Sequence, residues 1–220
     1  MAVTTIRAFI RRESFIEKLV LSKVFWTLSF IFLFGYPILR TISRDLPPPP
    51  SVMHQLPEYS LTNEFGKPFG SKDLQGKTYI ANFMFTSCTS TCPKLMQQMQ
   101  TVQKRVKGLG TKIAIVTFTV DPVTDTPKVL FKHARKLQTN PFVWNFLTGD
   151  LAKIENILLQ GFKVGIGEKQ IVATDVYDIA HSEKLVLVDG NGAVRGYYSS
   201  DKDGINMLMI DVGLLVNTTI

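Results

Sequence analysis

The chain has 220 residues, 45% of them hydrophobic and 20% charged, a globular composition that excludes bulk disorder. Its two cysteines are too few for a disulfide scaffold or a four-cysteine zinc site. The net charge of +7 is largely a property of residues 1–50, where seven Lys and Arg face three acidic residues. The other 170 residues have a net charge of only +3, so we do not expect nucleic-acid binding.

Residues 19–39 form an apolar run with a single charge, Lys23. At about 1.5 Å per residue this run can cross a hydrocarbon core of about 30 Å, which predicts a transmembrane anchor. A cleaved signal peptide is the alternative, but no small-residue cleavage site follows the run. Five basic residues occur up to Lys23 and only Arg40 and Arg44 just after the run. The positive-inside rule therefore predicts that residues 1–18 lie in the cytoplasm or matrix.

The N-terminal region also bears on localisation. Glu13 and Glu17 are atypical of an acidic-poor transit peptide, which favours a bacterial inner-membrane protein with its domain in the periplasm. The alternative is the mitochondrial inner membrane, with the domain facing the intermembrane space. Four consecutive prolines lie within residues 40–55, which we interpret as an extended spacer. We expect the globular domain to occupy residues 56–220.

The first half of this domain alternates between strand and helix patterns. Residues 61–69 resemble two short strands around a glycine turn. Residues 78–85 are apolar on both faces, which is typical of a central strand. A helical pattern then starts at Pro93 and ends at Gly108 and Gly110, and its apolar positions are Leu95, Met96, Met99, Val102 and Val106.

The second half continues the alternation and ends in a hairpin. We expect strands at 112–120 and 142–147, and helices from Thr126 to about Leu137 and from Asp150 to about Gln160. Residues 184–189 and 193–198 flank a Gly-Asn-Gly turn, a strong hairpin signal, before a closing helix at 203–216. This order predicts an α/β sandwich with a mixed sheet, as a thioredoxin-like domain would have.

Both cysteines lie at one predicted junction between a strand and a helix. Cys88 and Cys92 form a C-x-x-x-C motif directly before Pro93. At a helix N-terminus, unpaired N–H groups and the helix dipole stabilise a thiolate, which is both a redox nucleophile and a soft metal ligand. The motif therefore indicates a reactive pair without deciding between disulfide exchange and metal binding.

The three histidines help with that choice. His54 lies in the predicted spacer, and His133 lies among basic residues on what we expect to be a solvated helix face. His181 comes just before a predicted buried strand and could complete a Cys₂His set with Cys88 and Cys92. Two thiolates and an imidazole suit copper in either oxidation state, and soft thiolates favour Cu(I).

Several separated motifs, in order, resemble the Sco/SenC family of membrane-anchored copper proteins with a thioredoxin-like fold. The first runs from Phe83 to Cys88 and continues from Cys92 to Leu95. The second comprises Thr119 to Pro122 and Asp125 to Pro127. The third runs from Tyr177 to Ser182 and is followed by Leu187 to Gly190 and by Gly192. Together with the apolar run and the spacer, these motifs make the resemblance specific.

The resemblance implies a copper metallochaperone that assists assembly of the CuA centre of cytochrome c oxidase. It implies that Cys88, Cys92 and His181 are the ligands of Cu(I) and Cu(II), and that Asp121 shapes a loop near the site. The implied partners are the copper subunit of the oxidase, or another copper or thiol protein, and the membrane through residues 19–39. On this interpretation the protein is not an enzyme.

Two enzymatic interpretations remain open. In the first, the chain is a membrane-anchored thiol-disulfide oxidoreductase in which Cys88 and Cys92 are the redox pair and His181 has no role. The second is a peroxidase-like enzyme, which would need an Arg close to an acidic, exposed cysteine. No Arg occurs between Thr78 and Lys104, which disfavours it.

Overall fold

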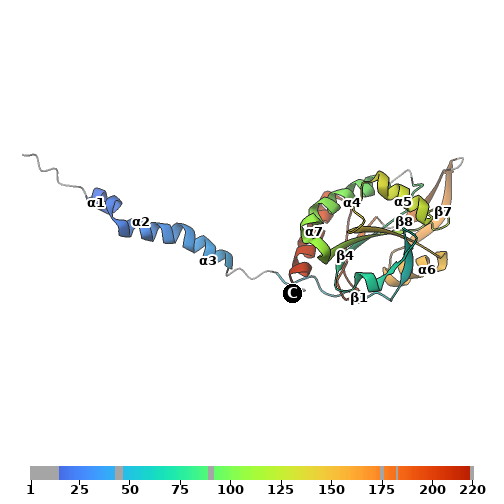
Figure 1. Cartoon of the computed structure of the whole chain (residues 1–220), viewed down its shortest axis with the longest axis horizontal. Coiled ribbons are helices and arrows are strands. Elements are labelled where there is room, and N and C mark those ends of the chain that lie inside the picture. Colours follow the sequence, from blue (N-terminus) through green and yellow to red (C-terminus); the bar gives the residue numbers. More distant parts are fainter. Residues whose placement is uncertain (1–14, 43–46, 89–91, 174–175, 182, 219–220) are drawn as a thin grey trace, which may run out of the picture. The chain divides into compact units, whose positions relative to one another are not determined.

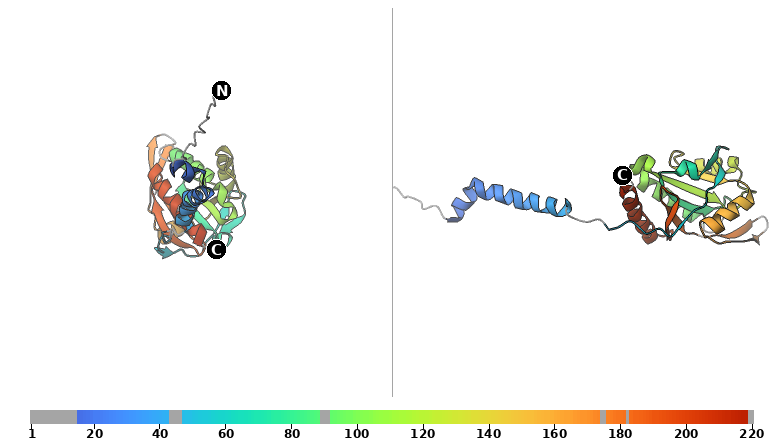
Figure 2. Two further views of the ribbon diagram at one scale, coloured as in Figure 1. Left: turned by 90° about the vertical axis from the view of Figure 1, so that its left-hand side faces the viewer. Right: turned by 90° about the horizontal axis from the view of Figure 1, so that it is seen from below.

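The computed structural model describes residues 15–42, 47–88, 92–173, 176–181 and 183–218, with the backbone alone for residues 15, 17, 18, 166–181 and 218. The chain divides into two compact units, residues 1–47 and 48–220. The first unit is helical and the second is an α/β domain (Figures 1 and 2). Because these are separate units, each is described by itself.

The N-terminal unit contains an apolar helix. Its elements are α1 (Phe15–Leu21), α2 (Lys23–Phe30), the π-helical turn η1 (Ile31–Gly35) and α3 (Tyr36–Ile42). Lys23–Ile42 is a helix of 20 residues with a mean hydropathy of 1.4, long and apolar enough to cross a membrane. A signal sequence near an N-terminus meets the same criterion. The helix begins and ends slightly later than the predicted run of residues 19–39.

The π-helical turn η1 ends at Gly35, and Pro37 is the second residue of α3, which follows it. Proline has no N–H to donate, and inside a helix its ring clashes with the carbonyl four residues earlier. A π-helical turn is one way to relieve that clash without ending the helix. The sequence therefore accounts for the irregularity of an otherwise continuous helix.

The domain has ten strands and four α-helices among the residues that the structure describes. The strands are β1 (His54–Gln55), β2 (Ser60–Asn63), β3 (Pro68–Gly70), β4 (Thr78–Met84), β5 (Ile113–Thr119), β6 (Trp144–Thr148), β7 (Ile166–Ala173), β8 (Val176–His181), β9 (Leu185–Val188) and β10 (Ala193–Tyr198). The α-helices are α4 (Cys92–Val106), α5 (Pro127–Lys136), α6 (Leu151–Asn156) and α7 (Lys202–Thr218). Short turns η2 (Ser71–Leu74), η3 (Lys107–Lys112) and η4 (Ile157–Gly161) connect them.

Eight of these strands form one mixed sheet, in the order β1-β10-β9-β4-β5-β6-β2-β3. The central strands β4, β5 and β6 are parallel, and β9 is antiparallel to β4. Every residue of β4 and β5 is buried, as the apolar runs predicted for central strands. The predicted α/β sandwich with a mixed sheet is therefore present.

Helices cover both faces of the sheet. Figure 1 shows α4, α5 and α7 on one side and α6 on the other. The first three lie side by side: Gln100 Nε2 donates to Leu137 O at 2.7 Å, and Arg105 Nη1 donates to Asn206 Oδ1 at 2.8 Å. The five apolar positions predicted for the helix at Pro93 are all buried in α4. Burying each such side chain contributes about 1.5–3 kcal/mol to folding.

The start of β6 differs from the prediction. We expected this strand to begin at Phe142, but it begins at Trp144, and Phe142 is 92% exposed. The cause is a turn at Asn140, whose Oδ1 accepts from Phe142 N–H at 3.1 Å. The carbonyl of Asn140 accepts from Trp144 N–H at 2.8 Å. Asparagine side chains often fold the chain in this way, which the apolar pattern concealed.

His54 belongs to the folded unit and not to a free spacer. Its strand β1 pairs with β10, and its Nε2 lies 2.8 Å from Gly161 O. Pro50, which lies even earlier in the chain, is also bound to the folded unit, because its carbonyl accepts from Arg195 Nη1 at 2.8 Å. The same guanidinium forms an ion pair with Asp189 at 2.6 Å. The compact unit starts at Pro48, upstream of the expected start at residue 56. A two-residue strand has no periodicity that a sequence could reveal.

The prediction for His133 was wrong. Instead of lying on a solvated face, the ring is half-buried, with its centroid 6.1 Å from that of Phe146. Burial lowers the pKa of His133, and the nearby Asp125 carboxylate partly opposes this shift. The imidazole packs between α5 and β6 while its charged neighbours on α5 point to solvent.

A second sheet is formed by β7 and β8, which pair only with each other. We predicted no strand between Gln160 and Lys184. The segment carries polar and charged residues throughout and has no Gly or Pro between its two strands, so it lacks the usual signals of a hairpin.

Candidate functional site

Cys88 and Cys92 lie together between β4 and α4, as the sequence predicts. Cys92 is the first residue of α4, and its N–H donates to Cys88 Sγ at 3.4 Å. The backbone turns back before the helix because Cys88 N–H donates to Phe85 O at 3.3 Å. The cysteines are only 7% and 4% exposed, and no disulfide joins them. An amide at a helix N-terminus that points at sulfur stabilises negative charge there.

A buried carboxylate supports this loop from behind. Asp125, which is fully buried, accepts from Thr86 N–H at 3.0 Å and also from the Thr86 hydroxyl. The oxygen that accepts from Thr86 N–H, Oδ2, also accepts from the Thr119 hydroxyl at 2.6 Å. Asp125 therefore ties the residue two positions before Cys88 to the end of β5.

Asp121 belongs to the same hydrogen-bond network, which connects the cysteine loop after β4 with the loop after β5. Its N–H donates to Thr119 Oγ1 at 3.0 Å, and its carbonyl accepts from Asp125 N–H at 2.9 Å. In the sequence, Asp125 is recognisable only as part of the second motif, which assigns it no role. An acidic residue just before a helix usually indicates an N-cap, so the sequence does not predict that the Asp125 side chain is buried.

Burial raises the pKa of Asp125 above its usual 3.8, and the hydrogen bonds from Thr119 and Thr86 partly oppose this. We expect Asp125→Ala to lower the free energy of unfolding by about 2–4 kcal/mol, because one buried donor (Thr119) and two half-buried donors (Thr86) lose their acceptor. Because the folded state binds the Asp125 proton more tightly than the unfolded state does, Asp125 contributes its full stabilisation when the pH is below the usual pKa of 3.8. That stability declines as the pH rises through the raised pKa.

Urea unfolding of the detergent-solubilised chain between pH 4 and 7 tests both points. Asp125→Asn should remove this part of the pH dependence and should destabilise less than alanine, since it keeps one acceptor. Asp150→Asn is the control, because Asp150 only caps the exposed start of α6. Equal stabilities for Asp125→Ala and the wild-type chain would show that the carboxylate does not hold the loop.

The third predicted ligand, His181, is the last residue of β8, where its Cα pairs with that of Ile166. Its side chain lies outside the described part of the structure. The strand that follows, β9, pairs with β4 so that Val186 lies opposite Ala81. Because the two strands are antiparallel, β9 begins at the edge of the sheet where β4 ends and the cysteine loop begins. Among the described side chains, no three His, Cys, Asp or Glu residues form a metal site.

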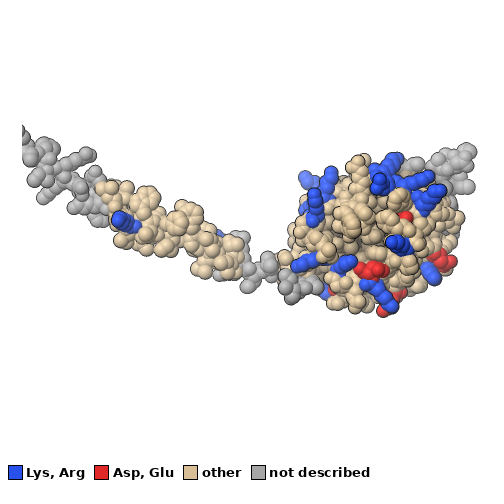
Figure 3. Space-filling model, in the orientation of Figure 1, with Lys and Arg blue, Asp and Glu red and all other residues tan. Residues whose placement is uncertain are grey.

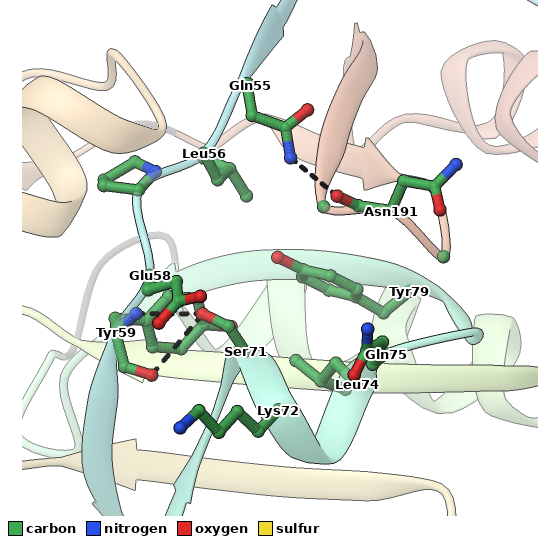
Figure 4. Close-up of a pocket in the computed structure, with 13 residues that line it drawn as sticks. Gln55, Leu56, Glu58, Tyr59, Ser71, Lys72, Leu74, Gln75, Tyr79 and Asn191 are labelled. Atoms are coloured by element: carbon green, nitrogen blue, oxygen red, sulfur yellow. Dashed lines mark hydrogen bonds between the residues drawn. The ribbon is translucent and has the colours of Figure 1, made fainter.

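A polar cleft of about 390 Å³ lies elsewhere in the domain (Figure 4). It is bounded by the chain after β1, by η2 and by the turn around Asn191, and Gln55 Nε2 donates to Asn191 O across it at 2.6 Å. Tyr79, near the start of β4, forms part of its wall. The cysteine loop follows the opposite end of the same strand, so the cleft is not part of the candidate site.

A buried dithiol at the N-terminus of the helix after a central strand of a mixed sheet defines a thioredoxin-like protein. The SCO1/SenC family matches residues 49–211 of the chain. The chain belongs to this family, as its motifs predicted. A curated relative, a SCO1 protein homolog of Bacillus subtilis, is 31% identical over 150 residues, which cover 66% of this chain and 78% of the relative.

Solved structures show the same fold. A SCO1/SenC family lipoprotein from Bacillus anthracis superposes with a TM-score of 0.66 at 32% identity, covering 74% of this chain and 95% of that one. BsSco, described as a member of the Sco family of cytochrome c oxidase assembly proteins with a disulfide switch, gives 0.66 at 26% identity, with coverages of 77% and 98%. ScoI of Bradyrhizobium japonicum with copper bound gives 0.63, with coverages of 73% and 99%; at 22% identity it shows the fold alone.

Proposed function

We propose that this protein is a copper metallochaperone in which Cys88, Cys92 and His181 bind copper for the assembly of the CuA centre of cytochrome c oxidase. The observation that carries the proposal is the pair of buried cysteines between β4 and α4. Within this pair, Cys88 Sγ accepts a hydrogen bond from the backbone N–H of Cys92. Thiolates are soft ligands that select Cu(I). The membership of BsSco in a family of oxidase assembly proteins supports the biological role.

In this proposal the chain's own groups hold copper as a cargo and not as a resident cofactor. The backbone N–H of Cys92 donates to Cys88 Sγ and would stabilise negative charge there. Asp125 holds Thr86, just before Cys88, in place. Copper leaves when thiols of the acceptor replace those of Cys88 and Cys92 one at a time. Oxidation of the two thiols to a disulfide would remove two of the three ligands, so the redox state of the pair controls loading.

The second candidate function is a membrane-anchored thiol-disulfide oxidoreductase that reduces a partner's cysteines. It is favoured by the same dithiol and by the disulfide switch described for BsSco. In this scheme the thiolate of one cysteine attacks the partner disulfide. The second cysteine then displaces the reduced partner and leaves a Cys88–Cys92 disulfide.

Copper titration of the full chain in detergent, before and after thiol reduction, tests the leading proposal. The reduced chain should take up one copper ion per chain, and the oxidised chain should bind it far more weakly. Equal binding by both forms would mean that the copper site does not include the thiols. A failure of either form to bind would leave the oxidoreductase as the function of the pair.

We also propose that residues 1–18 are cytoplasmic, that residues 19–39 lie in the bacterial inner membrane, and that residues 40–55 and 56–220 lie in the periplasm. The support is the apolar helix Lys23–Ile42 and the excess of basic residues before it. Full-length chain should remain in the membrane pellet after a carbonate wash. In spheroplasts, added protease should remove the domain. Recovery of the full-length chain in the soluble fraction would contradict the anchor.

A further inference from the structure

Every charged side chain on α4 and α5 is a cation. Between Thr86 and Asn140 the chain has nine Lys and Arg against two acidic residues, Asp121 and Asp125, and both of these are buried. The rest of residues 51–220 has nine basic and thirteen acidic residues. The small net charge of the domain therefore conceals a strong separation of charge between its faces.

Six exposed cations form what we call the basic face: Lys104, Lys107, Lys128, Lys132, Arg135 and Lys136. The helices that carry them are joined through Gln100 and Leu137, and Gln103 Oε1 accepts from Asn140 N–H at 2.7 Å. Figure 3 shows Lys and Arg along the side of the domain where Figure 1 places α4 and α5, with most of the visible acidic side chains on the other side. Within the described residues, none of the six forms an ion pair.

The stability of α5 does not explain this pattern. Lys128, Lys132 and Lys136 are spaced four residues apart, so they repel one another along one stripe of the helix. Lys128 also lies in the first turn, where the helix dipole disfavours a cation, and that turn has no acidic residue. Only the cations of the last turn are favourable for the helix.

One end of the basic face, at Lys128 in the first turn of α5, lies near the cysteine loop. Lys128 follows Asp125 by three residues, and Asp125 binds Thr86, two residues before Cys88. Val123, in the loop between β5 and α5, has a side chain that is 78% exposed. A molecule bound along α5 would therefore extend to the end of the sheet at which the thiols lie.

We propose that the basic face docks an acidic surface of the protein that receives copper from Cys88 and Cys92. This inference rests on the proposed function and adds the chemistry by which the acceptor is recognised. Complementary charge speeds encounter and orients the two proteins, and its effect falls with ionic strength. The acceptor's own thiols then lie opposite the cysteine loop while its carboxylates face α5.

An anionic membrane is a less suitable occupant. Helices that lie on a bilayer bury an apolar face among the lipids. The apolar positions of α4, and Leu130 and Ala134 of α5, are buried. Phe131 of α5 is 39% exposed, and the polar side chains of Gln97, Thr101 and Gln138 are exposed in the same segments as the cations. A surface of this kind suits a hydrated protein interface with a polar rim.

Copper transfer from the loaded full-length chain in neutral nanodiscs to the reduced, copper-free domain of the oxidase copper subunit tests the proposal. We expect the second-order rate to fall at least tenfold when Lys128→Glu, Lys132→Glu and Lys136→Glu are combined. The difference should shrink as salt is raised from 20 mM to 500 mM, where charges are screened within a few ångströms. Glutamine at the same three positions should give an intermediate rate.

The matched control reverses three other exposed lysines, with Lys67→Glu, Lys72→Glu and Lys153→Glu, and should leave the rate within twofold. Copper stoichiometry and thermal unfolding of each variant separate a docking defect from a failure to load or fold. Equal rates in the two triple variants would overturn the basic face while leaving the proposed function intact. Protection of α5 amides from hydrogen exchange by anionic nanodiscs without acceptor would assign the face to the membrane instead.

Discussion

Either Cys88→Ser or Cys92→Ser is expected to abolish tight copper binding by the reduced chain. Serine keeps the size of the side chain but replaces a soft thiolate by a hydroxyl, which is a poor ligand for Cu(I). The chain has no third cysteine that could supply the lost thiolate, and the described side chains contain no other group of three His, Cys, Asp or Glu residues that could hold a metal. We expect the apparent affinity for Cu(I), measured by competition with a chromogenic chelator, to fall at least a hundredfold for each variant.

The control for these variants is the conformation of the loop. A hydroxyl in place of a buried thiol can destabilise the fold, so urea unfolding of each variant in detergent is measured beside the titration. Cys88→Ala removes the sulfur without adding a polar group and should bind copper as poorly as Cys88→Ser. A double serine variant that binds copper with wild-type affinity would show that the site lies elsewhere.

Replacing His181 by alanine is expected to separate metal binding from thiol redox chemistry. We expect His181→Ala to weaken copper binding by at least tenfold, and more for Cu(II) than for Cu(I), because Cu(II) prefers nitrogen together with sulfur. The reduction potential of the Cys88–Cys92 pair should change by less than about 30 mV, equivalent to about 1.4 kcal/mol for two electrons. In cells, the variant should fail to support oxidase assembly.

His54→Ala is a suitable comparison, because His54 lies on β1, next to Tyr197 and the end of η4. It should leave copper affinity unchanged. Full oxidase assembly with His181→Ala, combined with failure of Cys88→Ser, would instead mean that the thiols act without the metal. The oxidoreductase would then be the better description of the protein.

The parts of the fold that were predictable are those in which one physical signal dominates. Residues 78–85 are apolar on both faces and predict a central strand, and all seven residues of β4 are buried; the five apolar positions after Pro93 repeat at helical spacing. The placement of both cysteines follows directly, since they lie where that strand ends and that helix begins. The hairpin of β9 and β10 was evident from its Gly-Asn-Gly turn.

The features that sequence reasoning missed depend on contacts between distant residues. His54 is ordered by pairing with β10, and Asp125 is buried because Thr86 and Thr119, from two different strand ends, converge on it. Neither contact has a local pattern. The basic face was missed for a different reason, because a sum over residues 51–220 cancels cations on one face against acids on others.

The burial of the two sulfurs sets how fast they can react. Cys88 and Cys92 are only 7% and 4% exposed, so attack on either sulfur by a thiol of another protein is hindered until the surrounding chain moves. The observed exchange rate is then the intrinsic rate multiplied by the fraction of time the site is open. An opening that costs about 3 kcal/mol would slow alkylation or copper loss to bulk chelators roughly a hundredfold. An acceptor that binds the open form would be spared that delay, so burial makes release depend on the identity of the recipient.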